Sequence, residues 1–173
     1  MNSVKADRIL GALLALAVLG FGLTLRDVFE QRVIEAGDRA PSFSIKTDRG
    51  ATVSNSSFGG KLLVLNFWAT WCPPCVEEMP SLNQFASTFK DQGVVVLGVS
   101  IDRNQKAYKT FVERSQLTFP TAHDPEANIS SEYGTFKWPE TYVIDTNGKV
   151  VEKFIGPREW MSPETVRSIK AHL

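Results

Sequence analysis

Cys72 and Cys75, the two cysteines of this 173-residue chain, stand two residues apart in the sequence FWATWCPPC. Two thiols at this spacing can help bind a metal ion, form a structural disulfide, or act as a redox couple. A metal site needs about four ligands, and the remaining candidates are two separate histidines, His123 and His172. A structural disulfide across so short a loop stabilises a fold little. The spacing therefore favours a redox couple and no metal site.

The two prolines between the cysteines suit the first turn of a helix, where their missing N–H groups would have had no partner. Cys72 then becomes the N-cap, and the helix dipole lowers the pKa of its thiol. Since Pro73 and Pro74 have no N–H, the Cys75 amide is the nearby donor left to reach Cys72. Cys75 lies one turn further on, on the apolar side of the helix. We expect Cys72 to be the exposed attacking cysteine and Cys75 a buried cysteine that resolves the mixed disulfide.

Buried strands and amphipathic helices alternate around this pair. The run KLLVLNFWA, residues 61–69, predicts a strand that is buried on both faces, and apolar positions at helical spacing then predict a helix that ends near Gly93. A second buried strand, GVVVLGVSI, follows at residues 93–101. The next segments predict a helix that opens at Asn104, an extended piece at residues 117–124 and a brief helix that Gly134 ends.

The last part of the chain predicts a hairpin and a closing helix. Residues 139–145 and 150–156 form the two strands of the hairpin, and Asn147-Gly148 between them predicts a type I′ turn. Ser162 caps the final helix and Pro163 occupies its first position. With a further hairpin expected around residues 43–53, the pattern predicts an α/β fold whose mixed central sheet is covered on both faces.

The N-terminus contains an apolar segment, ILGALLALAVLGFGLTL at residues 9–25, which follows two basic residues, Lys5 and Arg8. Its length is at the short end of what spans a bilayer, and the basic residues place the N-terminus in the cytoplasm. We expect residues 1–8 to be cytoplasmic, 9–25 to be a retained transmembrane anchor, 26–37 a helical stalk and 38–173 the soluble domain. Cleavage of a signal peptide after Ala17 is the alternative.

The charge composition of the chain does not indicate nucleic-acid binding. Lysine plus arginine and aspartate plus glutamate both number 19, so the formal net charge is zero. No basic stripe and no basic patch with interleaved aromatic residues is present, so nothing indicates nucleic-acid binding.

The segment FWATWCPPC after a buried strand resembles the W-C-x-x-C signature of the thioredoxin superfamily. More narrowly, residues 40–173 resemble the membrane-anchored TlpA/ResA/CcmG-like thiol-disulfide oxidoreductases, through APSFSI, LNFWATWCPPCVEEMPSL, WPETYVID and DTNGKV. The resemblance implies a thioredoxin-like fold with an N-terminal β-hairpin extension, a redox-active Cys72–Cys75 disulfide and no cofactor.

The resemblance also assigns roles to single residues. Glu78 matches an acidic position of the family, near enough to take a proton from Cys75, and burial would raise its pKa. Thioredoxins proper carry a buried aspartate in the preceding strand, where this chain has Asn66. Pro80 matches the proline that kinks the active-site helix, and Pro139 matches the family's cis-proline. The substrate groove is then formed by Trp71, Pro73, Pro74, Trp138 and Pro139, and Trp138 is larger than the usual residue there.

The resemblance implies a reductant of protein disulfides in cytochrome c maturation, acting on the Cys-x-x-Cys-His sites of apocytochromes. It implies a CcdA/DsbD-type membrane electron donor, contact with the lipid bilayer through residues 9–25, and a catalytic domain outside a bacterial inner membrane. A general disulfide reductase is the main alternative. A peroxiredoxin-like peroxidase and a copper chaperone lack the expected motif or ligands.

Overall fold

The computed structural model describes residues 11–22 and 33–173, and the chain divides into a unit of residues 1–32 and a unit of residues 33–173. Residues 11–22 are helical and exposed. Among the described residues, no helix combines the length and apolarity that crossing a membrane requires. The ends of the predicted anchor, residues 9–10 and 23–25, lie outside the described residues, as do the predicted cytoplasmic residues 1–8.

The described end of the predicted stalk is not a helix. Residues 33–35 have no regular secondary structure and residues 36–37 lie in a turn, and Ile34 is buried with 4% of its surface exposed. The Ile34 N–H donates to the carbonyl oxygen of Tyr133 at 3.1 Å. The helix expected in this segment is absent at residues 33–37, where burial of Ile34 and a backbone hydrogen bond tie the chain to the folded unit.

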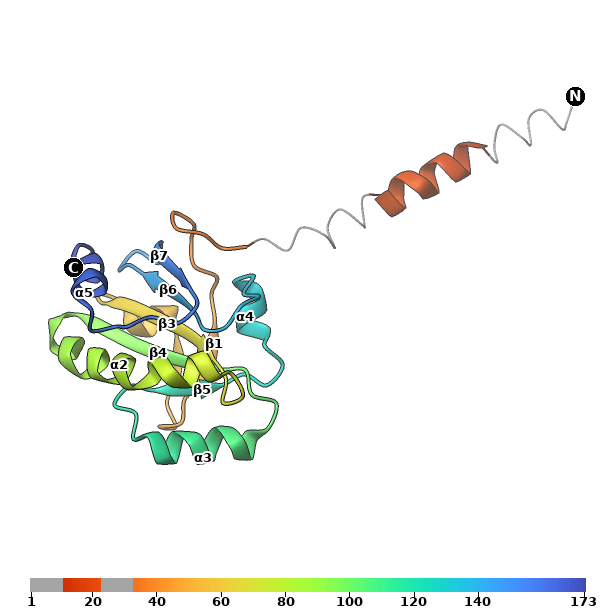
Figure 1. Ribbon diagram of the computed structural model, residues 1–173. Helices are drawn as coiled ribbons and strands as arrows, with labels where there is room; N and C mark the ends of the chain where they lie inside the picture. The colour runs from red at the N-terminus through yellow and green to blue at the C-terminus, as the bar shows by residue number, and fades with distance from the viewer. Residues whose placement is uncertain (1–10, 23–32) are drawn as a thin grey trace, which may run out of the picture. The chain divides into compact units, whose positions relative to one another are not determined.

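The core of the folded unit is a five-stranded mixed sheet in the order β5-β4-β3-β6-β7 (Figure 1). Strands β3 (Leu62–Trp68) and β4 (Val94–Ser100) and the edge strand β5 (Thr121–His123) are parallel. Strand β6 (Glu140–Ile144) runs antiparallel to β3, and β7 (Val150–Ile155) runs antiparallel to β6. All residues of β3 are buried, as the apolar run predicts.

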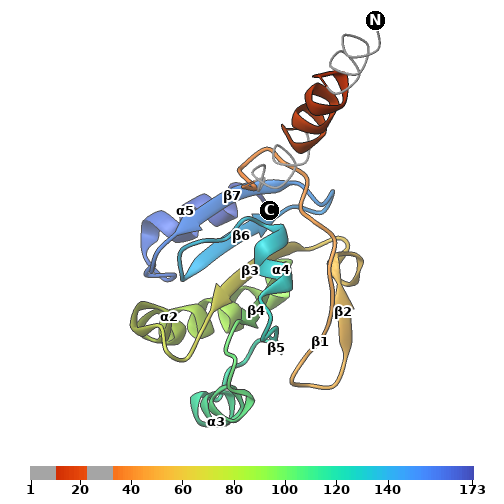
Figure 2. The same cartoon turned by 90° about the vertical axis from the view of Figure 1, so that its right-hand side faces the viewer.

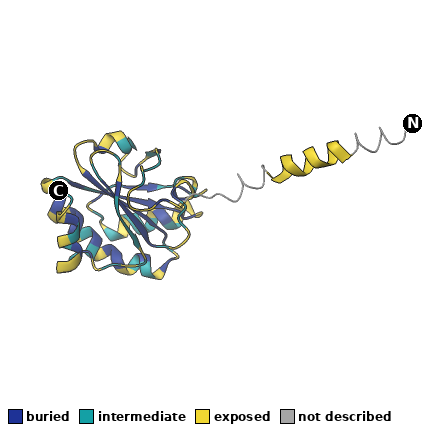
Figure 3. Cartoon of the chain, turned by 90° about the horizontal axis from the view of Figure 1, so that it is seen from above, coloured by how far each residue is buried: buried dark blue, intermediate teal, exposed yellow. Residues whose placement is uncertain are grey.

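Helices and a hairpin cover both faces of this sheet (Figure 2). Helices α2 (Pro73–Phe89) and α5 (Pro163–Lys170) lie on one face. Helix α4 (Asn128–Glu132) and the hairpin of β1 (Ser44–Lys46) and β2 (Thr52–Ser54) lie on the other. Helix α3 (Gln105–Ser115) lies beside β5. The predicted α/β architecture with a covered mixed sheet is therefore confirmed, and the sheet forms the buried centre of the unit (Figure 3).

Two distinct apolar clusters follow from this layering. Alternate residues of β3 point to opposite faces, so Val64 and Trp68 pack in the cluster under α2, whereas Leu65 and Phe67 pack in the cluster under α4 and the hairpin. Asn66, which lies between Val64 and Trp68 in this alternation, faces α2. The strand therefore presents a polar amide to the helix that carries the cysteines.

The hairpin turn between β6 and β7 differs from the sequence expectation. A type I′ turn needs positive φ at both central residues, but of Asn147 and Gly148 only the glycine has it, at 78°. The Asp145 carboxylate instead accepts hydrogen bonds from the N–H groups of Asn147 and Lys149, at 2.8 and 2.9 Å. This side-chain capping selects a longer turn, which is accompanied by a register shift between Val143 and Ile144.

Candidate active site

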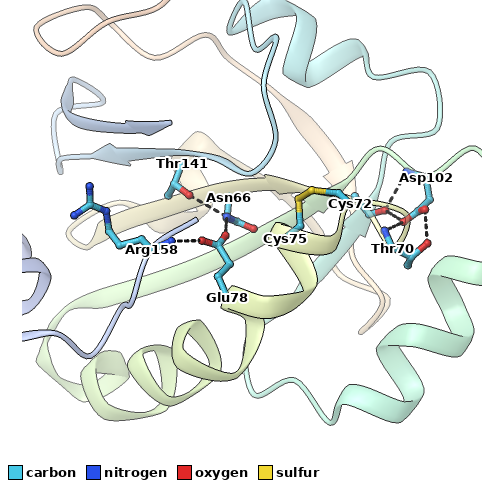
Figure 4. Close-up of a disulfide and its surroundings, with 9 residues drawn as sticks. Asn66, Thr70, Cys72, Cys75, Glu78, Asp102, Thr141 and Arg158 are labelled. Carbon is cyan, nitrogen blue, oxygen red and sulfur yellow. Dashed lines mark hydrogen bonds between the residues drawn. A yellow bond between two sulfur atoms is a disulfide. The ribbon is translucent and has the colours of Figure 1, made fainter. Parts of the chain in front are cut away.

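The two cysteines form a disulfide at the start of α2 (Figure 4). Cys72 is the N-cap of the helix, and Pro73 and Pro74 occupy its first positions, as the sequence predicts. The first helical hydrogen bond runs from the Val76 N–H to the Cys72 carbonyl oxygen at 3.2 Å. The helix then continues through Pro80 to Phe89.

Burial of the pair is less asymmetric than expected. Cys75 is fully buried, as predicted, but Cys72 is also buried, with 5% of its surface exposed. The expectation of an exposed Cys72 is wrong for the oxidised protein, because its sulfur is bonded to the buried Cys75 and packs in the same apolar cluster. Within the described part of the chain, no side-chain hydrogen bond forms at the Cys72 cap.

Glu78 lies one helical turn after Cys75 and is buried, with 4% of its surface exposed. Its Oε1 accepts a hydrogen bond from Asn66 Nδ2 at 2.8 Å. Its Oε2 accepts from the Arg158 backbone N–H at 3.0 Å and from Trp160 Nε1 at 3.4 Å. Removal from water raises the pKa of this carboxyl group to about 7, although the hydrogen bonds from Arg158, Asn66 and Trp160 oppose the shift. Glu77, the neighbouring acid, is exposed.

Arg158 and Trp160, which hold Glu78, lie in the segment between β7 and α5 and were not found from the sequence. Trp160 is fully buried, and the Arg158 guanidinium lies 3.9 Å from the centre of the Phe154 ring. The indole is the kind of signal that sequence reasoning could have used, because the N–H of a buried tryptophan usually finds a hydrogen-bond acceptor. Arg158 binds Glu78 through its backbone N–H, a group that nearly every residue type has, so its identity in the sequence gives no such signal.

A second buried carboxylate holds the segment before Cys72. Asp102 has 1% of its surface exposed, and its two oxygens accept from the Thr70 hydroxyl at 2.6 Å and the Thr70 N–H at 3.0 Å. Ser100 Oγ donates to the same carboxylate at 2.7 Å. Figure 4 shows Asp102 on the Cys72 side of the disulfide and Glu78 on the Cys75 side. Sequence reasoning missed Asp102, although an acidic residue directly after a buried strand is a recognisable feature.

Trp71 directly precedes Cys72, and Trp138 packs against the apolar cluster that contains both cysteines. The Trp138–Pro139 peptide bond is cis, as the resemblance implies. The rings of Trp71 and Trp138 meet edge to face with their centres 5.9 Å apart. Trp71 is exposed over 58% of its surface, and Phe136, two residues before Trp138, over 57%. Two of the expected groove residues, Trp71 and Trp138, therefore contact each other, and Phe136 adds an exposed ring nearby in sequence.

The sequence of this chain is similar to those of known thiol-disulfide oxidoreductases. The model of the AhpC/TSA family matches residues 36–153. A thiol-disulfide oxidoreductase ResA of Bacillus cereus is 35% identical over 157 residues, covering 88% of this chain and 91% of the relative. ResA of Geobacillus thermodenitrificans is 35% identical over 161 residues, covering 93% of this chain and 89% of the relative.

Solved structures extend the similarity to the fold. A putative thiol:disulfide interchange protein DsbE from Chlorobium tepidum superposes with a TM-score of 0.74 at 31% identity, covering 81% of this chain and 98% of that protein. StoA from Bacillus subtilis superposes with a TM-score of 0.65 at 27% identity, covering 76% and 97%. The predicted thioredoxin-like fold is thus confirmed. The chain belongs to the AhpC/TSA family and, within it, is a thiol-disulfide oxidoreductase of the ResA type.

Proposed function

We propose that this oxidoreductase acts as a reductant of protein disulfides, with Cys72 as the attacking cysteine, Cys75 as the resolving cysteine and Glu78 as the proton acceptor. The observation that carries the proposal is the buried Glu78 carboxyl group one turn after Cys75, whose pKa is raised to about 7. A general base is most effective when its pKa lies near the working pH. Glu78 meets this condition, and its position on α2 keeps it on the Cys75 side.

The reaction then has two steps. The Cys72 thiolate attacks one sulfur of a client disulfide, forms a mixed disulfide and expels the other client sulfur as a thiolate. Cys75 next transfers its proton to Glu78, and its sulfur attacks Cys72. The bond between Cys72 and the client breaks, the second client thiolate leaves with the electron pair, and the Cys72–Cys75 disulfide remains. The client gains two electrons, which the two cysteines lose.

The surroundings of the disulfide support an extended client with apolar side chains. Trp71, Pro73, Pro74, Trp138 and Pro139 form the groove in this proposal. An exposed indole such as that of Trp71 supplies a large apolar contact together with a polar N–H. Because Trp138 packs against Trp71, this proposal makes the groove narrow on the side of the cis-proline. The narrow groove then selects clients by the size of the residue next to their cysteine.

The finer assignment rests on similarity to the ResA-type relatives. The clients in this proposal are the Cys-x-x-Cys-His sites of apocytochromes c, and a CcdA/DsbD-type membrane protein returns electrons to the pair. Residues 9–25 attach the chain to the bacterial inner membrane with residues 1–8 in the cytoplasm and the folded unit outside. The apolar sequence of residues 9–25 and the two basic residues before it support this placement.

Titration of the Cys72–Cys75 couple in glutathione and dithiothreitol buffers tests the direction of electron flow. We expect a midpoint potential below about −220 mV, in the range of reductants. A midpoint near about −120 mV would make the protein an oxidant and contradict the proposal.

Client choice is tested with a Cys75→Ser variant, which cannot resolve the mixed disulfide. We expect it to trap an oxidised peptide with the Cys-x-x-Cys-His sequence faster than a scrambled disulfide peptide of equal composition. The Cys72→Ser variant is the matched control and should trap neither peptide. Equal trapping of both peptides by Cys75→Ser would favour a general disulfide reductase.

A further inference from the structure

Asn66 places an amide in an otherwise hydrophobic strand, and half of that amide has no partner. Its Nδ2 donates to Glu78 Oε1 at 2.8 Å and to Thr141 Oγ1 at 2.9 Å. Its Oδ1 is buried and accepts no hydrogen bond from the residues that the structure describes. An unpaired buried acceptor lowers the stability of the fold, because it has lost its hydrogen bonds to water. In a redox protein, an acceptor that is unpaired in the oxidised state can find its hydrogen-bond donor in the reduced state.

The position of Asn66 indicates which group could pair with this oxygen. Val64 and Trp68, on the same face of β3 as Asn66, pack in one cluster with Cys75. Asn66 is hydrogen-bonded to Glu78, which follows Cys75 by one turn of α2. Figure 4 shows the Asn66 amide between the Glu78 carboxyl group and Cys75. The amide oxygen therefore lies on the side of the site where the Cys75 sulfur sits.

A disulfide sulfur has no hydrogen to donate, whereas a cysteine thiol is a weak donor. Reduction of the Cys72–Cys75 bond thus creates a new donor beside the unpaired oxygen. We propose that Asn66 Oδ1 accepts a hydrogen bond from the Cys75 thiol in the reduced protein. This inference deepens the proposed function, on which it rests, by naming Asn66 as a positioning residue for the proton that Cys75 gives up.

The two ends of one amide would then hold both partners of the proton transfer. Oδ1 orients the Cys75 S–H while Nδ2 fixes Oε1 of Glu78. During resolution the thiol proton moves to the Glu78 carboxylate, and the Cys75 sulfur forms its bond to Cys72 as the client thiolate departs. The S–H···O bond exists in the reduced state alone, so it favours reduction of the pair.

The orientation of the amide is itself supported by its contacts. The reverse orientation would place an Asn66 oxygen 2.8 Å from Glu78 Oε1, where the nitrogen now lies. Two acceptor oxygens at this distance repel each other unless Glu78 carries a proton on that side. With Glu78 ionised, the orientation that leaves Oδ1 toward Cys75 is the stable one.

Infrared spectroscopy of the thiol tests the proposal directly. In a Cys72→Ser background Cys75 is the one thiol of the chain, and its S–H stretching band moves to lower frequency when the thiol donates a hydrogen bond. We expect the band at a lower frequency than that of a solvent-exposed thiol, and we expect Asn66→Leu to move it upward. Thr141→Val, which removes the other partner of Nδ2 and leaves Oδ1 in place, is the matched control and should not move the band.

A double variant guards against misfolding of Asn66→Leu. Asn66→Asp with Glu78→Gln exchanges amide and carboxylate, so the pair can keep its hydrogen bond and an oxygen still faces Cys75. We expect this variant to retain the low-frequency band. An S–H band that is the same in the Cys72→Ser protein with and without Asn66→Leu would overturn the proposal, as would a band already at the frequency of a free thiol.

The redox equilibrium gives an independent measure. With both cysteines present, we expect Asn66→Leu to shift the equilibrium with glutathione toward the disulfide by roughly threefold to tenfold, and Thr141→Val to leave it nearly unchanged. An unshifted equilibrium in Asn66→Leu would contradict the proposal. If the S–H band behaves as expected but the wild-type protein reduces no client disulfide, the hydrogen bond stands and the proposed function fails.

Discussion

At the scale of single residues, the pKa of Glu78 depends on two opposing effects, its burial and its hydrogen bonds. Three donors from distant parts of the chain, on Asn66, Arg158 and Trp160, bind its two oxygens. These hydrogen bonds favour the charged form, but the loss of water outweighs them and the pKa stays near 7. A group in this balance can both accept and release a proton close to neutral pH.

The raised pKa of Glu78 predicts how stability depends on pH. Below about pH 4.5 the group is protonated in both the folded and the unfolded chain. Between about pH 4.5 and pH 7 the unfolded chain ionises while the folded one does not, so the free energy of unfolding falls by up to about 3 kcal/mol. Urea unfolding of the oxidised protein across this range should show the fall, and Glu78→Gln should remove it. Equal pH slopes in the two proteins would contradict the assignment.

The proposed role of Glu78 also predicts a kinetic effect. Glu78→Gln should slow resolution of the mixed disulfide by about 100-fold, the lower end of what a positioned base contributes. Single-turnover stopped-flow measurements with a preformed mixed disulfide would follow this step. Glu77→Gln is the matched control, because Glu77 is exposed, and its rate should equal that of the wild type. Unchanged resolution in Glu78→Gln would remove the residue from the mechanism.

At the scale of elements, strand β4 carries a glycine at the point where two aromatic side chains approach its backbone closely. Gly98 of β4 pairs with Asn66 of β3 and with Thr121 of β5. A Cβ atom at Gly98 would meet Trp68 Nε1 at 3.0 Å and Phe119 Cε2 at 3.1 Å. A Cβ atom at this position would therefore press against two buried rings, which would have to shift.

This contact predicts a cost for a single added methyl group. Gly98→Ala should lower the free energy of unfolding by roughly 1–3 kcal/mol, the usual effect of overpacking a core. Denaturant unfolding monitored by tryptophan fluorescence would measure it, since Trp68 is one of the rings displaced. Gly148→Ala tests a different cause: no atom lies within 4 Å of its Cβ position, but its φ is 78°. Stability unchanged in Gly98→Ala would show that the rings yield without strain.

At the scale of the whole molecule, the folded unit starts earlier in the chain than its sequence pattern indicates. Ile34 is buried in the cluster under α4 and the hairpin. Next to it, Glu35 pairs at 3.0 Å with Lys153, and Lys153 also contacts the fully buried Glu140 at 3.2 Å. The segment at residues 33–37 therefore contributes packing and charge pairing to the unit.

A comparison of two shortened chains tests this contribution. A protein that begins at Asp38 should be less stable than one that begins at Val33 by about 2–4 kcal/mol, because it loses the burial of Ile34. Chemical unfolding of the two proteins in the oxidised state would give the difference. Ile34→Ala in the longer protein should reproduce most of it, whereas equal stability of both chains would place residues 33–37 outside the fold.

The sequence alone predicts most of the elements and the centre of the site. The apolar run at residues 61–69, the two prolines after Cys72 and the Ser162-Pro163 cap are local patterns, and each led to the element that the structure contains. The cis bond at Pro139 followed from the resemblance. Local patterns suffice here because buried strands, caps and helix starts depend on neighbours within a few residues.

The tertiary structure decided the features that join distant segments. Arg158 and Trp160 lie 80 and 82 residues further along the chain than Glu78, to which they donate hydrogen bonds, and no local pattern links them. The burial of Ile34 and of Cys72 depends on what packs over them, and the turn at Asn147 depends on the Asp145 side chain. The sequence therefore determined the cysteine pair and the elements that carry it. The environment that sets the proton affinity of Glu78 exists only once α2, β3 and the segment between β7 and α5 have come together, because desolvation is a property of the packed chain.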